Sequence, residues 1–254
     1  MSEYKTNFQR KEIKYLLSAR QYESLQLFLS KIAEVDEYGK TRINNIYFDT
    51  PSFRLIRTSL EKPLYKEKLR LRTYGRTNDD TNAFIEIKKK YKGIVYKRRV
   101  NGAYQNAYDY LVKNGLPLDD SQISMEIEEF RKLYQNPVPA MRICYDRVAM
   151  AGKEDKDLRI TFDSNIIWDE KALDLRAEGK GHQILRKGEV LMELKVLNSI
   201  PNDLSENLSE LGIFPVSFSK YGRGYQDMMD RNTRELTLRH GIFEFVRKGE
   251  MVYA

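Results

Sequence analysis

The sequence predicts an α+β fold in which a closed, eight-stranded antiparallel β-barrel carries helices on its outside. Two observations lead to this prediction. Eight long segments alternate polar and apolar residues with the period of two that is typical of β-strands. Between them lie segments with helical periodicity, whose apolar stripes need an apolar side of a sheet to pack against. Eight long strands suit a barrel or a large sandwich, and the charge pattern on the strands favours the barrel.

The predicted strands share this alternation and are bounded by turn-forming residues. The long strands are residues 10–17, 42–49, 66–75, 83–91, 94–101, 139–151, 157–163 and 188–197. Shorter candidates lie near residues 166–168, 172–176, 182–187 and 235–247. Residues 75–82, GRTNDDTN, have the composition of a hairpin tip between two strands.

Capping signals and apolar stripes predict the helices. Ser18 and Gln21 form the S-x-x-Q capping box of a helix over residues 18–34. Thr50 before Pro51 predicts a helix start, and that helix reaches Leu60. The remaining predicted helices are residues 103–114, 121–135, 202–211 and 221–231. Because no linker interrupts the pattern, we expect one domain over residues 1–254, with a core of about residues 10–225 and a C-terminal extension, residues 226–254.

The overall charge predicts an anionic partner. Lysine and arginine exceed aspartate and glutamate by 44 to 37, which gives a net charge of +7. Nucleic acid, a phosphorylated small molecule and a membrane surface all meet this requirement. The single cysteine, Cys144, excludes an internal disulfide and fits a reducing, cytoplasmic location. We expect no signal peptide and no membrane span, because the apolar runs are too short; association with a separate membrane protein stays open.

The charged residues of the strands fall on one parity, and cations dominate that parity. In the segment KEKLRLRTYG, Lys68, Arg70 and Arg72 alternate with Leu69 and Leu71. A solvated sheet face would explain such alternation in any one strand. However, like charges side by side repel each other, and the predicted helices need the apolar parity. We therefore expect the cations to face the inside of the barrel.

An enclosed set of cations needs counter-charge, because each unpaired, desolvated charge costs several kcal/mol. A bound polyanion would supply that charge. The tripeptide E-x-K recurs on the strands at Glu12, Glu86 and Glu193, and carboxylate oxygens suit Mg²⁺ or Mn²⁺. Many cations, a few carboxylates and a divalent metal are the requirements of phosphoryl transfer, whose transition state spreads negative charge over oxygens.

These residues resemble a known family. The segments that carry the resemblance occur in the order RKEIKY, IYFDT, KLRLRTYG, FIEIKKK, YKRR, YDRVAM, LRITFD, LMELK and SFSKY. This order is similar to that of the VTC domain, the polyphosphate polymerase domain of the triphosphate tunnel metalloenzyme (CYTH-like) superfamily, over residues 10 to about 225. The resemblance implies a tunnel that binds a triphosphate with a divalent metal, and transfer of the γ-phosphoryl group of ATP to inorganic polyphosphate. Hydrolase members usually carry a fuller E-x-E-x-K motif, whereas Arg10 stands at its first position here.

The resemblance also implies roles for individual positions. The implied catalytic residues, which hold the phosphates, are Lys14, Arg70, Arg72, Lys88, Arg147, Arg159 and Lys220. Further substrate contacts are expected from Lys97, Tyr145, Ser219 and Lys195. Glu193 is the implied ligand of Mn²⁺ or Mg²⁺, and the alternation adds Glu12 and Glu86 as acidic candidates. Tyr47 or Tyr74 is a candidate contact for the nucleobase.

Other functions stay open at this point. A triphosphate hydrolase, acting on tripolyphosphate or a nucleoside triphosphate, would use the same site with water as acceptor. A non-catalytic module could bind polyphosphate or an inositol polyphosphate. A nucleic-acid binder would interleave aromatic residues with its cations, whereas Leu69 and Leu71 are aliphatic. We therefore expect ATP and polyphosphate as partners, and no nucleic acid.

Overall fold

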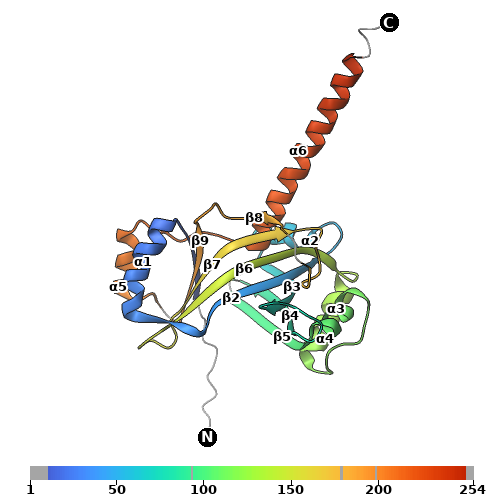
Figure 1. Ribbon diagram of the computed structural model, residues 1–254. Coiled ribbons are helices and arrows are strands. Elements are labelled where there is room, and N and C mark those ends of the chain that lie inside the picture. The colour runs from blue at the N-terminus through green and yellow to red at the C-terminus, as the bar shows by residue number, and fades with distance from the viewer. Residues whose placement is uncertain (1–10, 93, 178–179, 198, 250–254) are drawn as a thin grey trace.

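One curved antiparallel sheet organises the molecule (Figure 1). The structure, a computed structural model, describes residues 11–92, 94–177, 180–197 and 199–249. In spatial order the sheet contains β1 (Lys11–Leu17), β9 (Val190–Val196), β7 (Arg159–Asp169), β6 (Val138–Gly152), β2 (Ala33–Asp49), β3 (Tyr65–Tyr74), β4 (Asn82–Tyr91) and β5 (Ile94–Ala103). A short strand, β8 (His182–Gln183), pairs with β7. The predicted α+β class with an antiparallel sheet is therefore confirmed.

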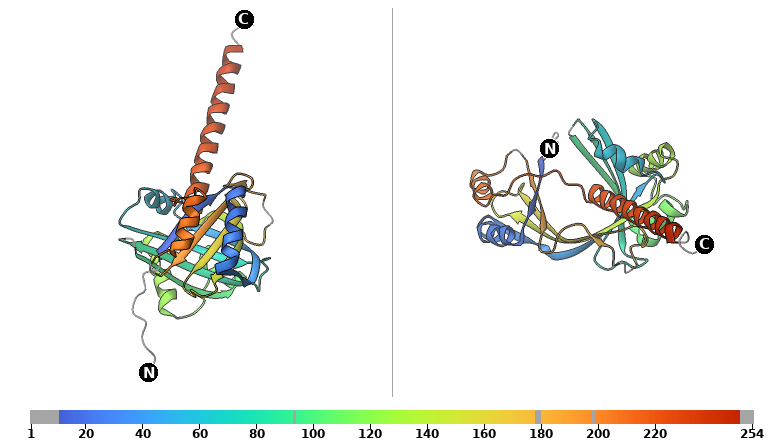
Figure 2. Two further views of the ribbon diagram at one scale, coloured as in Figure 1. Left: turned by 90° about the vertical axis from the view of Figure 1, so that its left-hand side faces the viewer. Right: turned by 90° about the horizontal axis from the view of Figure 1, so that it is seen from above.

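The predicted closure of the barrel is not confirmed. The ladder of paired strands begins at β1 and ends at β5, and no hydrogen-bonded ladder joins these two edges within the described residues. The view from above in Figure 2 shows how strongly the sheet curves. Curvature brings side chains from the two ends together: Lys88 Nζ on β4 lies 3.9 Å from Glu12 Oε2 on β1.

Two helix pairs cover the outer side of the sheet, as the apolar parity predicts. The pair α1 (Ala19–Ile32) and α5 (Asn202–Glu210) packs on β1, β9 and β7, where its leucines meet Tyr15, Phe162 and Leu194. The pair α3 (Tyr104–Val112) and α4 (Gln122–Leu133) packs on β3, β4 and β5, against Leu71 and Ile87. The apolar residues of these strands are buried under helices, so the charged parity forms the inner side of the sheet.

A third apolar cluster lies between α2 (Arg54–Leu60), the first turns of α6 (Lys220–Gly249) and the sheet. Tyr221 of α6 stacks on Tyr47 of β2, with ring centroids 4.8 Å apart and an interplanar angle of 15°. Its hydroxyl donates to the buried carboxylate of Asp49, which also accepts from the backbone N–H groups of Leu55 and Ile56. The start of α6 is thus fixed against the end of β2. None of the described helices is long and apolar enough to cross a membrane.

Several predicted boundaries differ from the structure. The capping box of Ser18 and Gln21 is present, but α2 begins at Arg54 rather than Thr50, because Asp49 caps its first N–H groups. Residues 172–176 form no strand, and 182–187 contributes only β8. The predicted strand at 235–247 is wrong: α6 continues through it, since extending an existing helix costs less than starting a new element. Arg10 lies outside the described residues.

Candidate functional site

The register of β3, β4 and β5 aligns cations on the inner side. Lys68, Lys88 and Lys97 stand opposite one another in one row across the three strands. The next row contains Arg70, Glu86 and Arg99 in the same order. On the other half of the sheet, Glu12, Lys195 and Arg159 form one row and Lys14, Glu193 and Thr161 the next. Charges of the inner side are therefore placed by strand pairing rather than by loops.

Residues just before α6 and at its start connect these two halves. Lys14 Nζ donates to the carbonyl oxygen of Phe218 at 3.2 Å, and Lys68 Nζ donates to Ser219 Oγ at 3.0 Å. Lys220, the first residue of α6, pairs with Asp163 of β7 at 2.5 Å. Charged side chains from both ends of the sheet thus converge on one site, which we call the inner cationic site.

Glu86 is the counter-ion of one part of this site. Its carboxylate lies 2.6 Å from Arg70 Nε, 3.6 Å from Arg72 Nε and 2.5 Å from Lys97 Nζ, and its side chain is 1% exposed. Burial opposes its ionisation, but the three cations outweigh burial and lower the pKa of Glu86 to about 2. Arg72 also donates to Asn45 Oδ1 and to the hydroxyl of Tyr145, so its guanidinium is held from three sides.

Asp163 is a second buried counter-ion, and it was not among the predicted site residues. Arg147 donates to its two oxygens at 2.6 and 2.8 Å, and Lys220 approaches from α6. Burial opposes the ionisation of Asp163, but Lys220 and Arg147 outweigh it and lower its pKa. Both cations also lie over the Tyr145 ring, at 4.5 Å for Lys220 and 5.3 Å for Arg147. The sequence does contain an indication of this role, because Asp163 lies four residues after Arg159 and therefore on the same, inward-facing side of the strand.

Lys68 was also omitted from the predicted residues, although it lies on the charged parity. Its neighbours across the ladder are lysines, and its hydrogen-bond acceptor is the neutral Ser219. Burial, together with Lys66, Lys88 and Lys14, lowers the pKa of Lys68 to about 8. A cation held in this way gains from the arrival of an anion.

The carboxylates predicted to bind metal separate into two environments. Glu12 and Glu193 both contact Lys14 Nζ, at 3.1 and 3.9 Å, and Glu193 also contacts Lys195 at 2.9 Å. Glu86 is instead committed to three cations. Among the described residues no group of three or more histidine, cysteine or acidic side chains is arranged to hold a metal. Two carboxylates on neighbouring strands do fit Mg²⁺ or Mn²⁺ in the form these ions take with substrate phosphates, which supply the remaining ligands.

The remaining predicted residues differ in how accessible they are. Arg159 is exposed at the start of β7, beside Lys195, and makes no ion pair within the described residues. Tyr47 is buried under Tyr221 and accepts from Arg70, which leaves no free ring face for a nucleobase. Tyr74 is 39% exposed at the end of β3.

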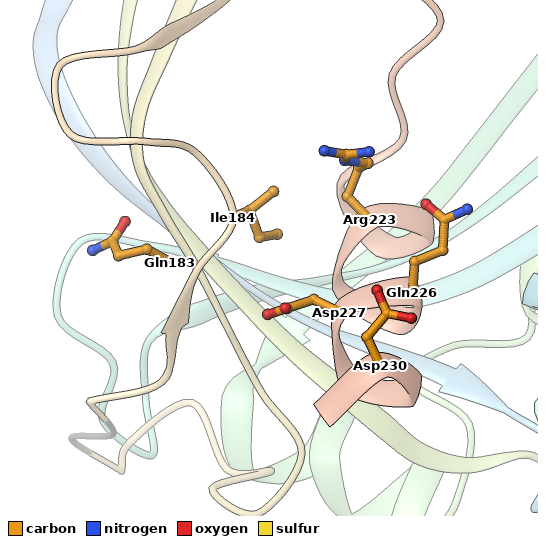
Figure 3. Close-up of a pocket in the computed structure, with 6 residues that line it drawn as sticks. All are labelled: Gln183, Ile184, Arg223, Gln226, Asp227 and Asp230. Atoms are coloured by element: carbon orange, nitrogen blue, oxygen red, sulfur yellow. The ribbon is translucent and has the colours of Figure 1, made fainter. Parts of the chain in front are cut away.

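A separate hollow of about 170 Å³ lies between residues Gln183 and Ile184 and α6 (Figure 3). Among its polar lining residues, Asp227 is held within the protein, since it accepts from Trp168 Nε1 at 2.8 Å and from Arg231 Nε at 3.0 Å. It shares no residue with the inner cationic site, and we assign it no ligand.

Comparison with known proteins agrees with this architecture. The chain matches the family model described as VTC domain over residues 9–229. No curated protein matches it. The fold is similar to that of a candidate adenylate cyclase from Bacillus halodurans, with a TM-score of 0.52 and 14% identity, over 83% of this chain and 95% of that one. A candidate adenylyl cyclase from Hippeastrum, described as revealing a dominant triphosphatase activity, gives a TM-score of 0.50 and 16% identity, over 85% and 95%.

The curved antiparallel sheet, the helices on its outer side and the cations that converge on its inner side define an α+β protein with a basic, partly buried inner site. The chain belongs to the VTC domain family, because the family model matches most of its length. The resemblance predicted from the order of the strand segments is thereby confirmed. The two solved structures show the shared fold alone at these identities.

Proposed function

We propose that the protein is a metal-dependent polyphosphate polymerase, which transfers the γ-phosphoryl group of ATP to a growing polyphosphate chain. The observation that carries this proposal is the convergence of cations from both halves of the sheet on one site. Arg70, Arg72 and Arg147 are oriented by buried carboxylates, as a binding site for phosphate oxygens requires. Lys68 pairs with no carboxylate among the described residues, and Lys88 reaches only Glu12, at 3.9 Å, so both would supply charge to the bound anion.

In this proposal the arginines grip and orient the nucleotide phosphates, while Lys14, Lys88 and Lys220 neutralise charge on the transferring group. Glu12 and Glu193 would hold Mg²⁺ or Mn²⁺, which would stabilise charge on the phosphate oxygens when bound. The acceptor is the terminal phosphate of the polyphosphate chain. It is already anionic at neutral pH, so the site needs no strong general base.

Triphosphate hydrolysis is the second candidate. The fold is shared with the Hippeastrum protein, whose description names a triphosphatase activity. The same cations would bind the substrate, and water would replace the phosphate acceptor. A binding module without turnover would need neither acceptor nor metal. We further propose that the whole chain acts as one domain in the cytoplasm, in keeping with the single, buried Cys144.

One incubation separates these functions. The purified chain is mixed with ATP and Mn²⁺ or Mg²⁺, and the products are resolved on a gel. Long phosphate chains support the polymerase, free phosphate alone supports the hydrolase, and unchanged ATP supports the binding module. The variant Arg70→Ala should lose turnover. The matched control is Arg98→Ala on β5, because Arg98 pairs with Glu126 on the outer side and should not contact substrate.

A further inference from the structure

The cations of β3 and β4 extend beyond the site just described. Along the inner side of β3, Lys66, Lys68, Arg70 and Arg72 follow one another at every second position. Lys90 of β4 stands opposite Lys66, one row beyond Lys68 and Lys88. At about 3.4 Å per residue, the row from Arg72 to Lys66 spans about 20 Å. The positive surface is therefore elongated along the strands.

The lysines of this extension lack counter-charge within the described part of the chain. Among the described residues no carboxylate lies within ion-pair distance of Lys62, Lys66 or Lys90. Lys66 Nζ donates to a neutral acceptor, the carbonyl oxygen of Ser59, at 3.1 Å. Burial and the charges of Lys90, Lys62 and Lys88 lower the pKa of Lys66.

The outer side of the same strands differs. Lys89 of β4 and Arg98 of β5 both pair with Glu126 of α4, at 3.8 and 3.0 Å. A lysine that is fully solvated needs no anionic partner. Two like charges that stand opposite each other in a β-ladder, however, destabilise the ladder. The opposed pair Lys66 and Lys90 is continuous with the inner cationic site, so an anion bound there would have to be long and continuous as well.

We propose that Lys62, Lys66 and Lys90 bind phosphate units of a chain that extends beyond the triphosphate. This inference rests on the proposed function and adds to it the direction in which the polymer lies. A nucleotide triphosphate ends within the rows of Arg70 and Lys68. A linear polyphosphate continues along β3 and β4 and meets the three lysines, which therefore select for length.

The test measures equilibrium binding without ATP or metal, with tripolyphosphate and long-chain polyphosphate as probes. The double variant K66A/K90A should weaken binding of the long chain about tenfold or more and that of tripolyphosphate less than about twofold. The matched control, K89A/R98A, removes the same charge from the outer side of the same strands and should alter neither affinity. Thermal unfolding of both variants establishes that they are folded.

Equal loss for both probes, or loss for neither, overturns the inference. An anionic surface is a second source of phosphate, so vesicles containing phosphatidylserine form another arm. Sedimentation with these vesicles that K66A/K90A abolishes, with unchanged polyphosphate affinity, assigns the lysines to a membrane and also overturns it. If the wild type prefers the long chain through these lysines but makes no polymer from ATP, the proposed polymerase fails while this inference stands.

Discussion

Lys68 and Lys88 lie directly opposite each other in the β3–β4 ladder, with no carboxylate between them. The carboxylate nearest to Lys88 belongs to Glu12, 3.9 Å away on β1, and Lys68 donates to the hydroxyl of Ser219. Like charges opposite one another destabilise a sheet. The ligand-free fold therefore carries a local electrostatic cost, which a bound anion removes, and any such anion stabilises the folded state.

Replacing Lys68 by methionine should make the protein more stable and a weaker binder. Removal of the repulsion should raise the free energy of unfolding by about 0.5–2 kcal/mol, as often happens at functional sites, while the affinity for tripolyphosphate falls. Urea denaturation and calorimetric titration measure the two effects. Lys89→Met is the control, because Lys89 pairs with Glu126 on the outer side. A less stable Lys68→Met variant with unchanged affinity would contradict this account.

The affinity for tripolyphosphate should fall as pH rises from 7 to 9. Lys68, with its pKa lowered to about 8, loses its charge in this range. Burial opposes ionisation of Tyr47, but Arg70, Lys68 and Arg72 outweigh burial and lower the pKa of Tyr47 to about 8, so a phenolate forms in the same range. Above about pH 8, Lys68 and Tyr47 are each more often protonated in the unfolded chain than in the folded protein, because folding lowers both pKa values. Stability should therefore rise with pH while affinity falls.

Lys68→Arg is the variant that checks this prediction, because its guanidinium stays charged at every pH used. The difference in affinity between wild type and variant is compared at each pH, so that titration of the ligand itself cancels. The alkaline fall should be shallower in the variant. Parallel curves would show that Lys68 does not titrate in this range.

Parity in the sequence predicted which side of each strand faces inward, and it did so for Arg70, Arg72 and Lys97. It could not separate Glu86 from Glu193, because both occur in the same E-x-K spacing. Strand register makes the difference: Glu86 lies between Arg70 and Arg99, whereas Glu193 lies beside Lys14. Register depends on long-range pairing, which local alternation does not specify.

The course of α6 was unpredictable for a related reason. Within residues 235–247, Leu236 and Leu238 alternate with the polar residues Glu235 and Thr237, which favours a strand when this segment is taken alone. In the chain it follows a helix whose first turns pack on Tyr47 and Trp168, and the pair Arg231–Asp227 continues the helical spacing. The packing of the first turns of α6 against the sheet thus favours a helical conformation for the rest of α6.

Glu86→Gln should destabilise the protein by about 3–5 kcal/mol, since it leaves Arg70, Arg72 and Lys97 without their buried counter-ion. The folded pKa of Glu86, about 2, lies below its ordinary value. Its contribution to stability is therefore present above about pH 4.5 and is lost as pH falls toward 2.

Denaturation curves over this pH range should be flatter for Glu86→Gln than for wild type. Tripolyphosphate should restore part of the lost stability, because it replaces the missing negative charge. The exposed Glu129, paired with Lys132 on the surface of α4, provides the control Glu129→Gln, which should unfold like wild type. A Glu86→Gln protein of normal stability would remove Glu86 from its role as counter-ion.

Tyr74→Ala should weaken binding of ATP but not of tripolyphosphate. Tyr74 lies on the inner parity of β3, two residues after Arg72, and is 39% exposed. Its ring packs edge-to-face with that of Phe84, with the ring centroids 5.8 Å apart. Stacking of a base on an aromatic ring contributes about 1–3 kcal/mol, so the ATP affinity should fall by about 5-fold to 150-fold. Tyr74→Phe keeps the ring and should bind ATP normally. If tripolyphosphate affinity falls as much as ATP affinity, Tyr74 supports the sheet through Phe84 and does not contact the base.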